Sequence, residues 1–292
     1  MTVLEAIQRS AEFLTKKGVE SPRLQAELSL AHVLKLKRMQ LYLSFERILT
    51  EIETTQYREL IQRRGEREPL QHILGACNFC GLELAVNKHV LVPRPETELL
   101  AEQGWQFLKQ LERAQTGPPK ALDVGTGSGC IAIALAAHSQ RANMTAIDKS
   151  AEALEVAGKN AASCGVNDRI QFVQGDGFEA LDPNGKFDLI ISNPPYISSA
   201  EIATLGPEVR DFDPISALDG GADGLAFFRL IADRGRAFLA GGGKCMVEFG
   251  DGQSLSLKKI FEEQNWIVDA VIEDYNRQPR IMIASRKNIS HG

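Results

Sequence analysis

The spacing of apolar residues divides this chain into an all-helical beginning and a longer part in which strands and helices alternate. Over residues 3–14 apolar side chains recur every three or four positions, which predicts an amphipathic helix. Ser21-Pro22 predicts the start of a second helix, with Ser21 as its N-cap and the proline in its first turn. A third helix is expected from about residue 51 to residue 64. Together these stripes indicate a small helical bundle with its own core.

Beyond this bundle the pattern changes to apolar runs of strand length. Residues 82–86 and 90–92, separated by the turn Asn87-Lys88-His89, predict a β-hairpin, and a helix is expected from about residue 97 to 111. Seven strands are then expected among helices, at residues 121–124, 144–147, 169–173, 187–192, 244–249, 266–272 and 280–285. The pattern predicts an α/β fold with a mostly parallel sheet. The expected divisions are a helical domain at 1–72, a hairpin linker at 73–95 and a sheet domain at 96–292.

Composition and cysteine usage narrow the class of protein. Hydrophobic residues make up 43% and charged residues 24% of the chain, as in ordinary globular proteins. No apolar run reaches the roughly 18 residues of a membrane span, and the N-terminus lacks a signal-peptide pattern, so a cytoplasmic protein without a membrane partner is expected. Five cysteines, an odd number, argue against a disulfide framework. Cys77 and Cys80 have C-x-x-C spacing but no second pair, and the histidines are scattered, so no metal site is predicted.

Charge is distributed unevenly along the chain. The formal net charge is −5, made up of +2 over residues 1–72 and −7 over the remainder. An acidic domain is poorly suited to holding a DNA backbone, so DNA is not expected as a partner. The small basic groups at 35–38 and 63–67 are interpreted as solvated helix faces, with contact to an acidic protein or RNA as the alternative. A monomer is expected.

Glycines at alternate positions follow the first predicted strand. The run Gly125-Thr126-Gly127-Ser128-Gly129 lies between that strand and an apolar helix, which is the first unit of a doubly wound sheet with its ligand at the strand's carboxyl end. Its spacing is neither that of the dinucleotide motif nor that of a Walker loop. Asp148 ends the next strand, where a carboxylate can accept both ribose hydroxyls. Asp176-Gly177-Phe178 follow the third strand, where an adenine can lie against backbone and ring.

The fourth predicted strand ends in Asn193-Pro194-Pro195-Tyr196. Two successive prolines lack N–H donors and fix the backbone, so this segment can present carbonyl oxygens from a rigid turn. Asn193 Oδ1 and the Pro194 carbonyl can accept the two hydrogens of a planar NH₂ group, while the Tyr196 ring packs against its plane. The alternative is a plain strand-to-loop turn. The aperiodic residues 197–223 are expected to wall this site, since so long a loop is usually functional.

These residues resemble the class I S-adenosylmethionine-dependent methyltransferases, and among them the N-methyltransferases with an Asn/Asp-Pro-Pro-Tyr motif. Residues 68–75, 90–98 and 205–210 are similar to the protein-glutamine N5-methyltransferases. That family modifies the glutamine of the Gly-Gly-Gln motif in class I peptide chain release factors, which act in translation termination. One departure is Gln278-Pro279 before Arg280, where the family usually has a glycine-containing turn.

The resemblance implies a class I methyltransferase fold, S-adenosylmethionine as the methyl donor and class I release factors as partners. It places Asp123 near the ammonium of the cofactor and implies that Arg94, Glu96 and Thr97 border cofactor and substrate; an ordered hairpin-to-helix joint is the alternative. The implied cofactor set is Arg94, Thr97, Asp123, Gly125, Thr126, Gly127, Ser128, Gly129, Asp148, Asp176, Gly177, Phe178 and Asn193. The implied catalytic residues are Asn193, Pro194, Pro195 and Tyr196, and Glu96 joins them in binding substrate.

Other functions use part of this pattern. A methyltransferase for a ribosomal-protein glutamine would carry a different sequence after Pro93-Arg94. A nucleic-acid adenine-N6 methyltransferase applies the same clamp to an exocyclic amine, but needs a basic groove and a surface for flipped bases. A nucleoside-binding module without catalysis would keep the glycine loop and have no use for the clamp.

Overall fold

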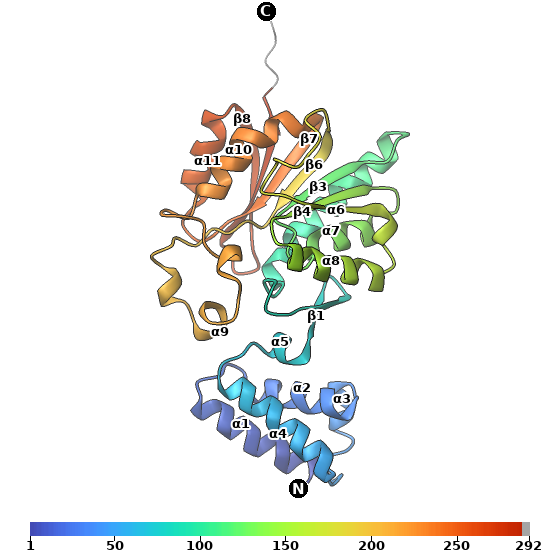
Figure 1. Cartoon of the computed structure of the whole chain (residues 1–292), viewed down its shortest axis with the longest axis vertical. Coiled ribbons are helices and arrows are strands. Elements are labelled where there is room, and N and C mark those ends of the chain that lie inside the picture. Colours follow the sequence, from blue (N-terminus) through green and yellow to red (C-terminus); the bar gives the residue numbers. More distant parts are fainter. Residues whose placement is uncertain (288–292) are drawn as a thin grey trace, which may run out of the picture. The chain divides into compact units, whose positions relative to one another are not determined.

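The computed structural model describes residues 1–287, in which helices precede a strand-rich part (Figure 1). Contacts group residues 1–76 and 205–212 into one unit, here called the helical unit. Residues 77–204 and, within the described part of the chain, those from 213 to 287 form the second, here called the sheet unit. The predicted boundaries at 72 and 95 stay predictions, but the assignment of 205–212 to the helical unit was not anticipated.

The helical unit is built as the apolar periodicity predicts. Its helices are α1 (Val3–Lys16), α2 (Pro22–Leu34), α3 (Arg38–Leu41), α4 (Glu51–Gly65), α5 (Leu70–Leu74) and α9 (Pro207–Arg210). Ile7, Leu14, Leu30 and Tyr57 are buried together in its core. The prediction of Ser21 as an N-cap is correct in position and wrong in mechanism. Ser21 has left-handed backbone angles, and its side chain makes no capping hydrogen bond.

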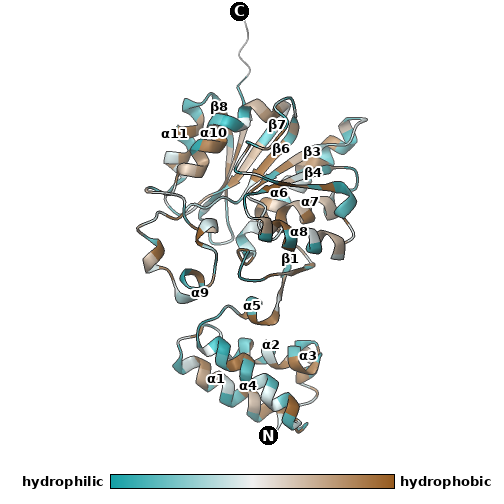
Figure 2. Ribbon diagram, in the orientation of Figure 1, coloured by the Kyte–Doolittle hydropathy of each residue, from teal (hydrophilic) through white to brown (hydrophobic). Residues whose placement is uncertain are grey.

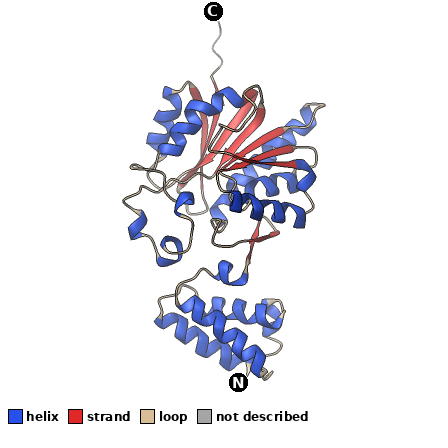
Figure 3. Ribbon diagram, viewed as in Figure 1, coloured by secondary structure: helices blue, strands red, loops and turns tan. Residues whose placement is uncertain are grey.

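Seven strands form the sheet of the second unit (Figure 3). They are β3 (Lys120–Val124), β4 (Asn143–Asp148), β5 (Ile170–Gln174), β6 (Phe187–Ser192), β7 (Leu239–Glu248), β8 (Trp266–Glu273) and β9 (Pro279–Arg286). Their order is β5-β4-β3-β6-β7-β9-β8, in which β9 runs antiparallel to both neighbours and the other pairings are parallel. The predicted mostly parallel seven-stranded α/β sheet is confirmed.

Successive strand residues point to opposite faces of the sheet, and each face has its own apolar layer. The core on one face contains Leu189 and Ile191 together with side chains of helices α6 (Pro95–Ala114) and α7 (Cys130–His138). The core on the other contains Ile190 with residues of α10 (Ala226–Phe238) and α11 (Ser254–Glu263). Figure 2 shows the resulting concentration of apolar residues in the central strands. Strands buried on both faces explain the nearly continuous apolar runs in the sequence.

The hairpin prediction is wrong about which segments pair. The two-stranded sheet pairs β1 (Ala76–Phe79) with β2 (Leu82–Ala85), and residues 90–92 form no strand. The turn is made by Cys80 and Gly81, both with positive φ angles of 51° and 80°, which suits a two-residue hairpin loop. Val90 is buried instead in a small apolar cluster with residues of α8 (Ala151–Ser163).

The order of the strands determines where a ligand can bind. From β3 the chain builds outward through β4 to β5, and then returns to place β6 against the other side of β3. Parallel sheets bind ligands outside the carboxyl ends of their strands at such a reversal. The glycine loop follows β3 and Asn193 follows β6, so the topology brings these segments to one edge.

Candidate active site

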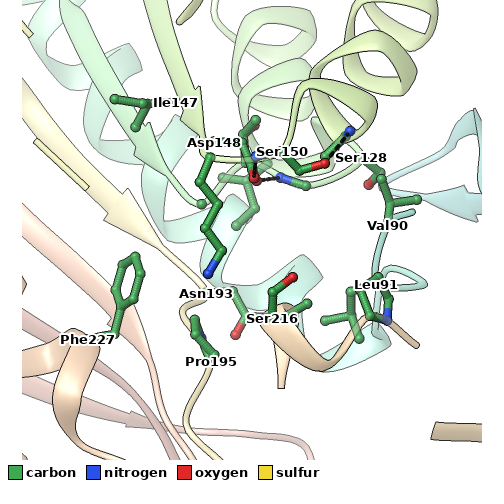
Figure 4. Close-up of a pocket in the computed structure, with 18 of the residues that line it drawn as sticks. Val90, Leu91, Ser128, Ile147, Asp148, Ser150, Asn193, Pro195, Ser216 and Phe227 are labelled. Atoms are coloured by element: carbon green, nitrogen blue, oxygen red, sulfur yellow. Dashed lines mark hydrogen bonds between the residues drawn. The ribbon is translucent and has the colours of Figure 1, made fainter. Parts of the chain in front are cut away.

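A cavity of about 560 Å³ lies at this edge of the sheet unit. Side chains from separate stretches of the chain surround it, including Val90, Asp148, Asn193, Ser216 and Phe227 (Figure 4). Of the residues predicted for the site, those lining it are Arg94, Thr97, Gly125, Thr126, Gly127, Ser128, Asp148, Asp176, Gly177, Asn193 and Pro195. Those outside its lining are Glu96, Asp123, Gly129, Phe178, Pro194 and Tyr196.

The shape of the glycine loop depends on backbone angles that residues with a side chain rarely adopt. Gly125, Gly127 and Gly129 have φ angles of 75°, 55° and 80°, in the left-handed region that favours glycine. A Cβ atom at Gly129 would lie 2.9 Å from Ile133 and 3.0 Å from Ala157, so this glycine allows close packing of the loop. At Gly125 and Gly127 a Cβ would meet no atom within 4 Å and would occupy open space. The first two glycines therefore leave their backbone accessible from the cavity.

Asp148 ties the second strand to this loop. Its Oδ2 accepts a hydrogen bond from the Gly127 N–H at 2.8 Å, and its Oδ1 accepts one from the Ser150 N–H at 3.0 Å. A carboxylate has about four lone-pair positions, so acceptor capacity remains for a ligand. The loop and the carboxylate are thus fixed against each other at the cavity wall.

Asp123 lies beneath the loop rather than in the cavity. Its Oδ2 accepts hydrogen bonds from the Thr126 hydroxyl at 2.7 Å and the Ala132 N–H at 3.2 Å. Burial raises the pKa of Asp123 to about 7, against the opposing effect of these two hydrogen bonds. Asp123 therefore supports the glycine loop from beneath. Its predicted role toward the ammonium group of the cofactor stays a prediction.

The predicted adenine residues are divided by the structure. Asp176 and Gly177 line the cavity, whereas Phe178 is buried and stacks on Phe238 with ring centroids 5.3 Å apart. The aromatic ring that lines the cavity is that of Phe227, from α10 (Figure 4). Sequence analysis missed this residue because its position depends on how the long segment after β6 returns to the sheet.

The four residues of the clamp are not equivalent. Asn193 and Pro195 line the cavity, and Asn193 Nδ2 donates a hydrogen bond to Thr97 Oγ1 at 3.0 Å. The Tyr196 ring packs on the apolar layer, with its edge 2.9 Å from where a Cβ atom of Gly250 would lie. Burial raises the pKa of Tyr196 to about 12, so its hydroxyl stays protonated. Among described residues no donor reaches Asn193 Oδ1 or the Pro194 carbonyl.

The joint before α6 carries the residues implied by the family resemblance. Arg94 Nη2 lies 2.6 Å from Asp213 Oδ2, which ties the start of α6 to the segment that walls the cavity at residues 214–219. Thr97 is buried in the first turn of α6. Lining residues that the sequence did not single out include His89, Leu91, Ser150, Pro214, Ile215, Ser216, Ala217, Phe227 and Leu230. The sequence signalled part of this set through the length of the aperiodic segment and, for Leu91, through the family resemblance of residues 90–98.

Neither a metal centre nor a membrane span is found in the part of the chain that the structure describes. Within residues 1–287 no three His, Cys, Asp or Glu side chains are grouped so as to hold a metal ion. Burial raises the pKa of the Cys77 thiol to about 11 and that of Cys80 to about 12, so neither is activated as a thiolate. None of the described helices has the length and apolar character required to cross a bilayer.

Both the N-terminal helical part of the chain and the part that follows it match known protein families. Residues 5–75 match the model of the PrmC N-terminal domain, and residues 103–205 match that of the methyltransferase small domain. A release factor glutamine methyltransferase of Geobacter sulfurreducens is 40% identical over 281 residues, covering 96% of this chain and 95% of that protein. A protein of the same name from Chlorobaculum tepidum is 40% identical over 282 residues, with 96% and 95% covered.

Two solved structures share the fold at low sequence identity. The catalytic domain of hMettl16, solved with an RNA hairpin, has a TM-score of 0.55 at 16% identity, covering 82% of this chain and 84% of that one. The 16S rRNA methyltransferase RsmC of T. thermophilus, solved with AdoMet and guanosine, has a TM-score of 0.50 at 17% identity, covering 73% and 50%. The class I methyltransferase fold is confirmed.

Proposed function

The chain belongs to the release factor glutamine methyltransferase family, and on that premise we propose how its residues hold the two substrates. It is an S-adenosylmethionine-dependent methyltransferase that acts on the side-chain amide nitrogen (N5) of a release factor glutamine. The observation that carries the proposed geometry is that Asp148 and Asn193 line the same cavity. A nucleoside-binding carboxylate and an amide-binding side chain thereby face one shared space.

The lining of the cavity offers a group to each part of the cofactor. The exposed backbone at Gly125 and Gly127 can approach the methionine part without a side chain intervening. Asp148 is oriented at the end of β4 to accept the ribose hydroxyls. Asp176, Gly177 and the ring of Phe227 line the same cavity and are the residues that would hold the adenine. The bound cofactor supplies an electrophilic methyl group on a sulfonium centre, and the protein's task is to bring the amide to it.

The clamp overcomes the weak nucleophilicity of an amide. The nitrogen lone pair is delocalised into the carbonyl, so it attacks only if the amide is positioned and its planarity is relaxed. Asn193 Oδ1 and the Pro194 carbonyl accept the two N–H hydrogens of the substrate glutamine, which directs the lone pair at the methyl carbon. The same oxygens stabilise the positive charge that develops on nitrogen. A proton lost from the methylated nitrogen afterwards completes the reaction, so no general base is required before transfer.

The proposal extends to the protein partner and to the oligomeric state of the enzyme. A Gly-Gly-Gln loop suits the clamp because glycines beside the glutamine carry no side chains to collide with its wall, and they allow the backbone to turn. We propose that class I release factors are bound as whole proteins by a monomeric, cytoplasmic enzyme, with the helical unit holding a second surface of the factor. A second contact would raise the local concentration of the loop.

Labelled S-adenosylmethionine with separate pools of release factor, DNA and RNA tests this assignment. The expected result is one methyl group on the intact release factor, located to the Gly-Gly-Gln glutamine by mass spectrometry and absent when that glutamine is replaced. The intact factor should be methylated far better than a short Gly-Gly-Gln peptide. Label in DNA or RNA would instead support adenine methylation, and label on a ribosomal protein would move the substrate within the glutamine-modifying class.

A further inference from the structure

The side-chain amide of Asn193 works in the clamp in only one of its two orientations. Its oxygen must face the substrate, because the substrate amide offers two N–H donors. A rotation of about 180° about the terminal torsion would present Asn193 Nδ2 instead and place donors against donors. The two ends of an Asn amide have nearly the same shape, so packing alone hardly distinguishes them. A polar neighbour must make the selection.

Thr97 is that neighbour, since its Oγ1 accepts the 3.0 Å hydrogen bond from Asn193 Nδ2. Thr97 is 2% exposed and lies in the first turn of α6, where a threonine often bonds to its own backbone. Here its hydroxyl is used across the structure instead, and it also lies close enough to Glu248 to lower the pKa of that carboxyl. The Glu248 Oε2 atom is buried and has no hydrogen-bond partner among the described residues. A hydroxyl has one hydrogen to donate, so the direction of one bond determines that of the other.

Glu248 can determine the direction in which the Thr97 hydroxyl donates its hydrogen. It ends β7, is 2% exposed and, when ionised, is an acceptor only. A Thr97 hydroxyl that donates to this carboxylate keeps a lone pair with which to accept the hydrogen bond from Asn193. We propose that Thr97 and Glu248 are positioning residues, a directed hydrogen-bond chain from Asn193 through Thr97 to Glu248 that keeps Asn193 Oδ1 turned toward the substrate amide. This inference rests on the proposed function of Asn193 in the clamp.

The charged neighbours of Glu248 leave its carboxylate available to accept a hydrogen bond from Thr97. Two arginines face it, but Arg280 is paired with Asp251 at 2.7 Å and Asp274 at 3.3 Å, and Arg94 is paired with Asp213. The other charged or titratable groups near it are Glu96 and Tyr196. Glu248 forms no ion pair among the described residues, which leaves its carboxylate available to accept a hydrogen bond from the Thr97 hydroxyl.

Protonation of Glu248 would reverse the chain. Burial raises the pKa of Glu248 to about 7, partly offset by the neighbouring Thr97 hydroxyl. A protonated carboxyl can donate to Thr97 Oγ1, which frees the Thr97 hydrogen to approach Asn193 and favours the turned amide. The rate of methyl transfer should therefore fall as the pH drops through about 7, while cofactor binding should not.

Substitutions that separate shape from hydrogen bonding test the proposal. Thr97→Val keeps the shape and removes the hydroxyl, and should lower kcat for release factor methylation about 10-fold or more with cofactor affinity within about 2-fold. Thr97→Ser keeps the hydroxyl and should retain activity within about 3-fold. Glu248→Gln can donate or accept, so it should lose about 3- to 10-fold at pH 8 and lose the acidic fall in rate seen in the unmodified enzyme.

A double-mutant cycle decides the mechanism. If Thr97 acts through Asn193, then Thr97→Val should cost less than about 2-fold in kcat in an Asn193→Ala background. An equal cost in both backgrounds would overturn the inference, as would an unchanged pH profile in Glu248→Gln. The proposed function fails differently, because in that case Asn193→Ala alone would leave turnover nearly intact. Thermal unfolding of each variant shows whether a loss reflects folding, and Thr97→Ser serves as the folded reference.

Discussion

Arg67 and Glu208 form a bidentate ion pair inside the helical unit, although they lie 141 positions apart in the sequence. Arg67 Nε donates to Oε1 and Nη2 donates to Oε2 of the Glu208 carboxylate, each over 2.6 Å. Arg64 Nη2 adds a third hydrogen bond at 2.8 Å, and its own side chain is only 4% exposed. These bonds connect α4 and the turn after it to α9, which explains why residues 205–212 belong to the helical unit.

Replacing Glu208 should therefore loosen this segment. Burial alone would raise the pKa of Glu208, but the hydrogen bonds from Arg67 and Arg64 outweigh it and lower the pKa to about 2. The contribution to stability is present above the unfolded pKa of about 4.5 and is lost as the pH falls toward 2. Glu208→Gln at pH 7 should cost about 2 kcal/mol locally, because it weakens charge-assisted bonds and leaves Arg64 partly uncompensated.

Hydrogen–deuterium exchange of residues 205–212 measures this effect directly. Asp211→Asn is a matched control in the same segment, because Asp211 also forms a bidentate pair, with Arg210, but one that is exposed. Exposed pairs contribute little, so the control should exchange like the unmodified chain. Equal exchange in Glu208→Gln and in the control would show that the partly buried pair does not hold the segment.

Asp148→Ala should weaken S-adenosylmethionine binding by about 1.5–3 kcal/mol, the range for hydrogen bonds that involve a charged group. The loss has two sources, the ribose contacts and the Gly127 N–H that Asp148 holds in place. Titration calorimetry measures it, with the exposed Asp233→Ala as a control for removal of one negative charge. Unchanged affinity in a folded Asp148 variant would remove this residue from the ribose site.

Asn193→Ala should reduce methyl transfer by about 100-fold or more and leave cofactor affinity nearly unchanged, since it removes one oriented acceptor from the reacting amide. Tyr196→Phe should be much milder than Tyr196→Ala, because the ring is packed on the apolar layer and against Gly250. Single-turnover rates with intact release factor compare the three variants. Survival of turnover within a few-fold in Asn193→Ala would contradict the amide-orienting mechanism.

The parts of the fold that follow from local pattern were predictable. Ile190 and its neighbours form a continuous apolar run because β6 is covered on both faces, and this run, with the glycine loop and Asp148, was sufficient to predict the sheet and its binding edge. The hairpin was misread because Cys80 adopts a left-handed conformation that its residue type does not signal.

The rest of the site depends on tertiary contacts that leave no periodic signal. Phe178 was predicted to contact adenine, but its ring stacks on Phe238 in the core, while Phe227 lines the cavity. Ser216 and its neighbours line the cavity from a short 3-10 helix, Ile215–Ala217, which the aperiodic sequence did not predict. The hydrogen bond between Thr97 and Asn193 joins residues 96 positions apart, and no spacing rule connects them.

Asp123 gives the clearest expected effect of pH on stability. Its carboxyl is 2% exposed, and burial raises its pKa from 3.8 to about 7. Between these values the native state holds a proton that the unfolded state has released, so this group's stabilising contribution is complete below about 3.8 and disappears as the pH rises through about 7. Asp123→Asn lacks this titration, so its free energy of unfolding should rise relative to the unmodified chain by up to about 4 kcal/mol between pH 4 and 7. Both proteins share Glu248 and every other titrating group, so the difference between their urea unfolding curves isolates Asp123. If the free energies of unfolding of the two proteins changed in parallel across that pH range, Asp123 would be ionised in the folded protein despite its burial.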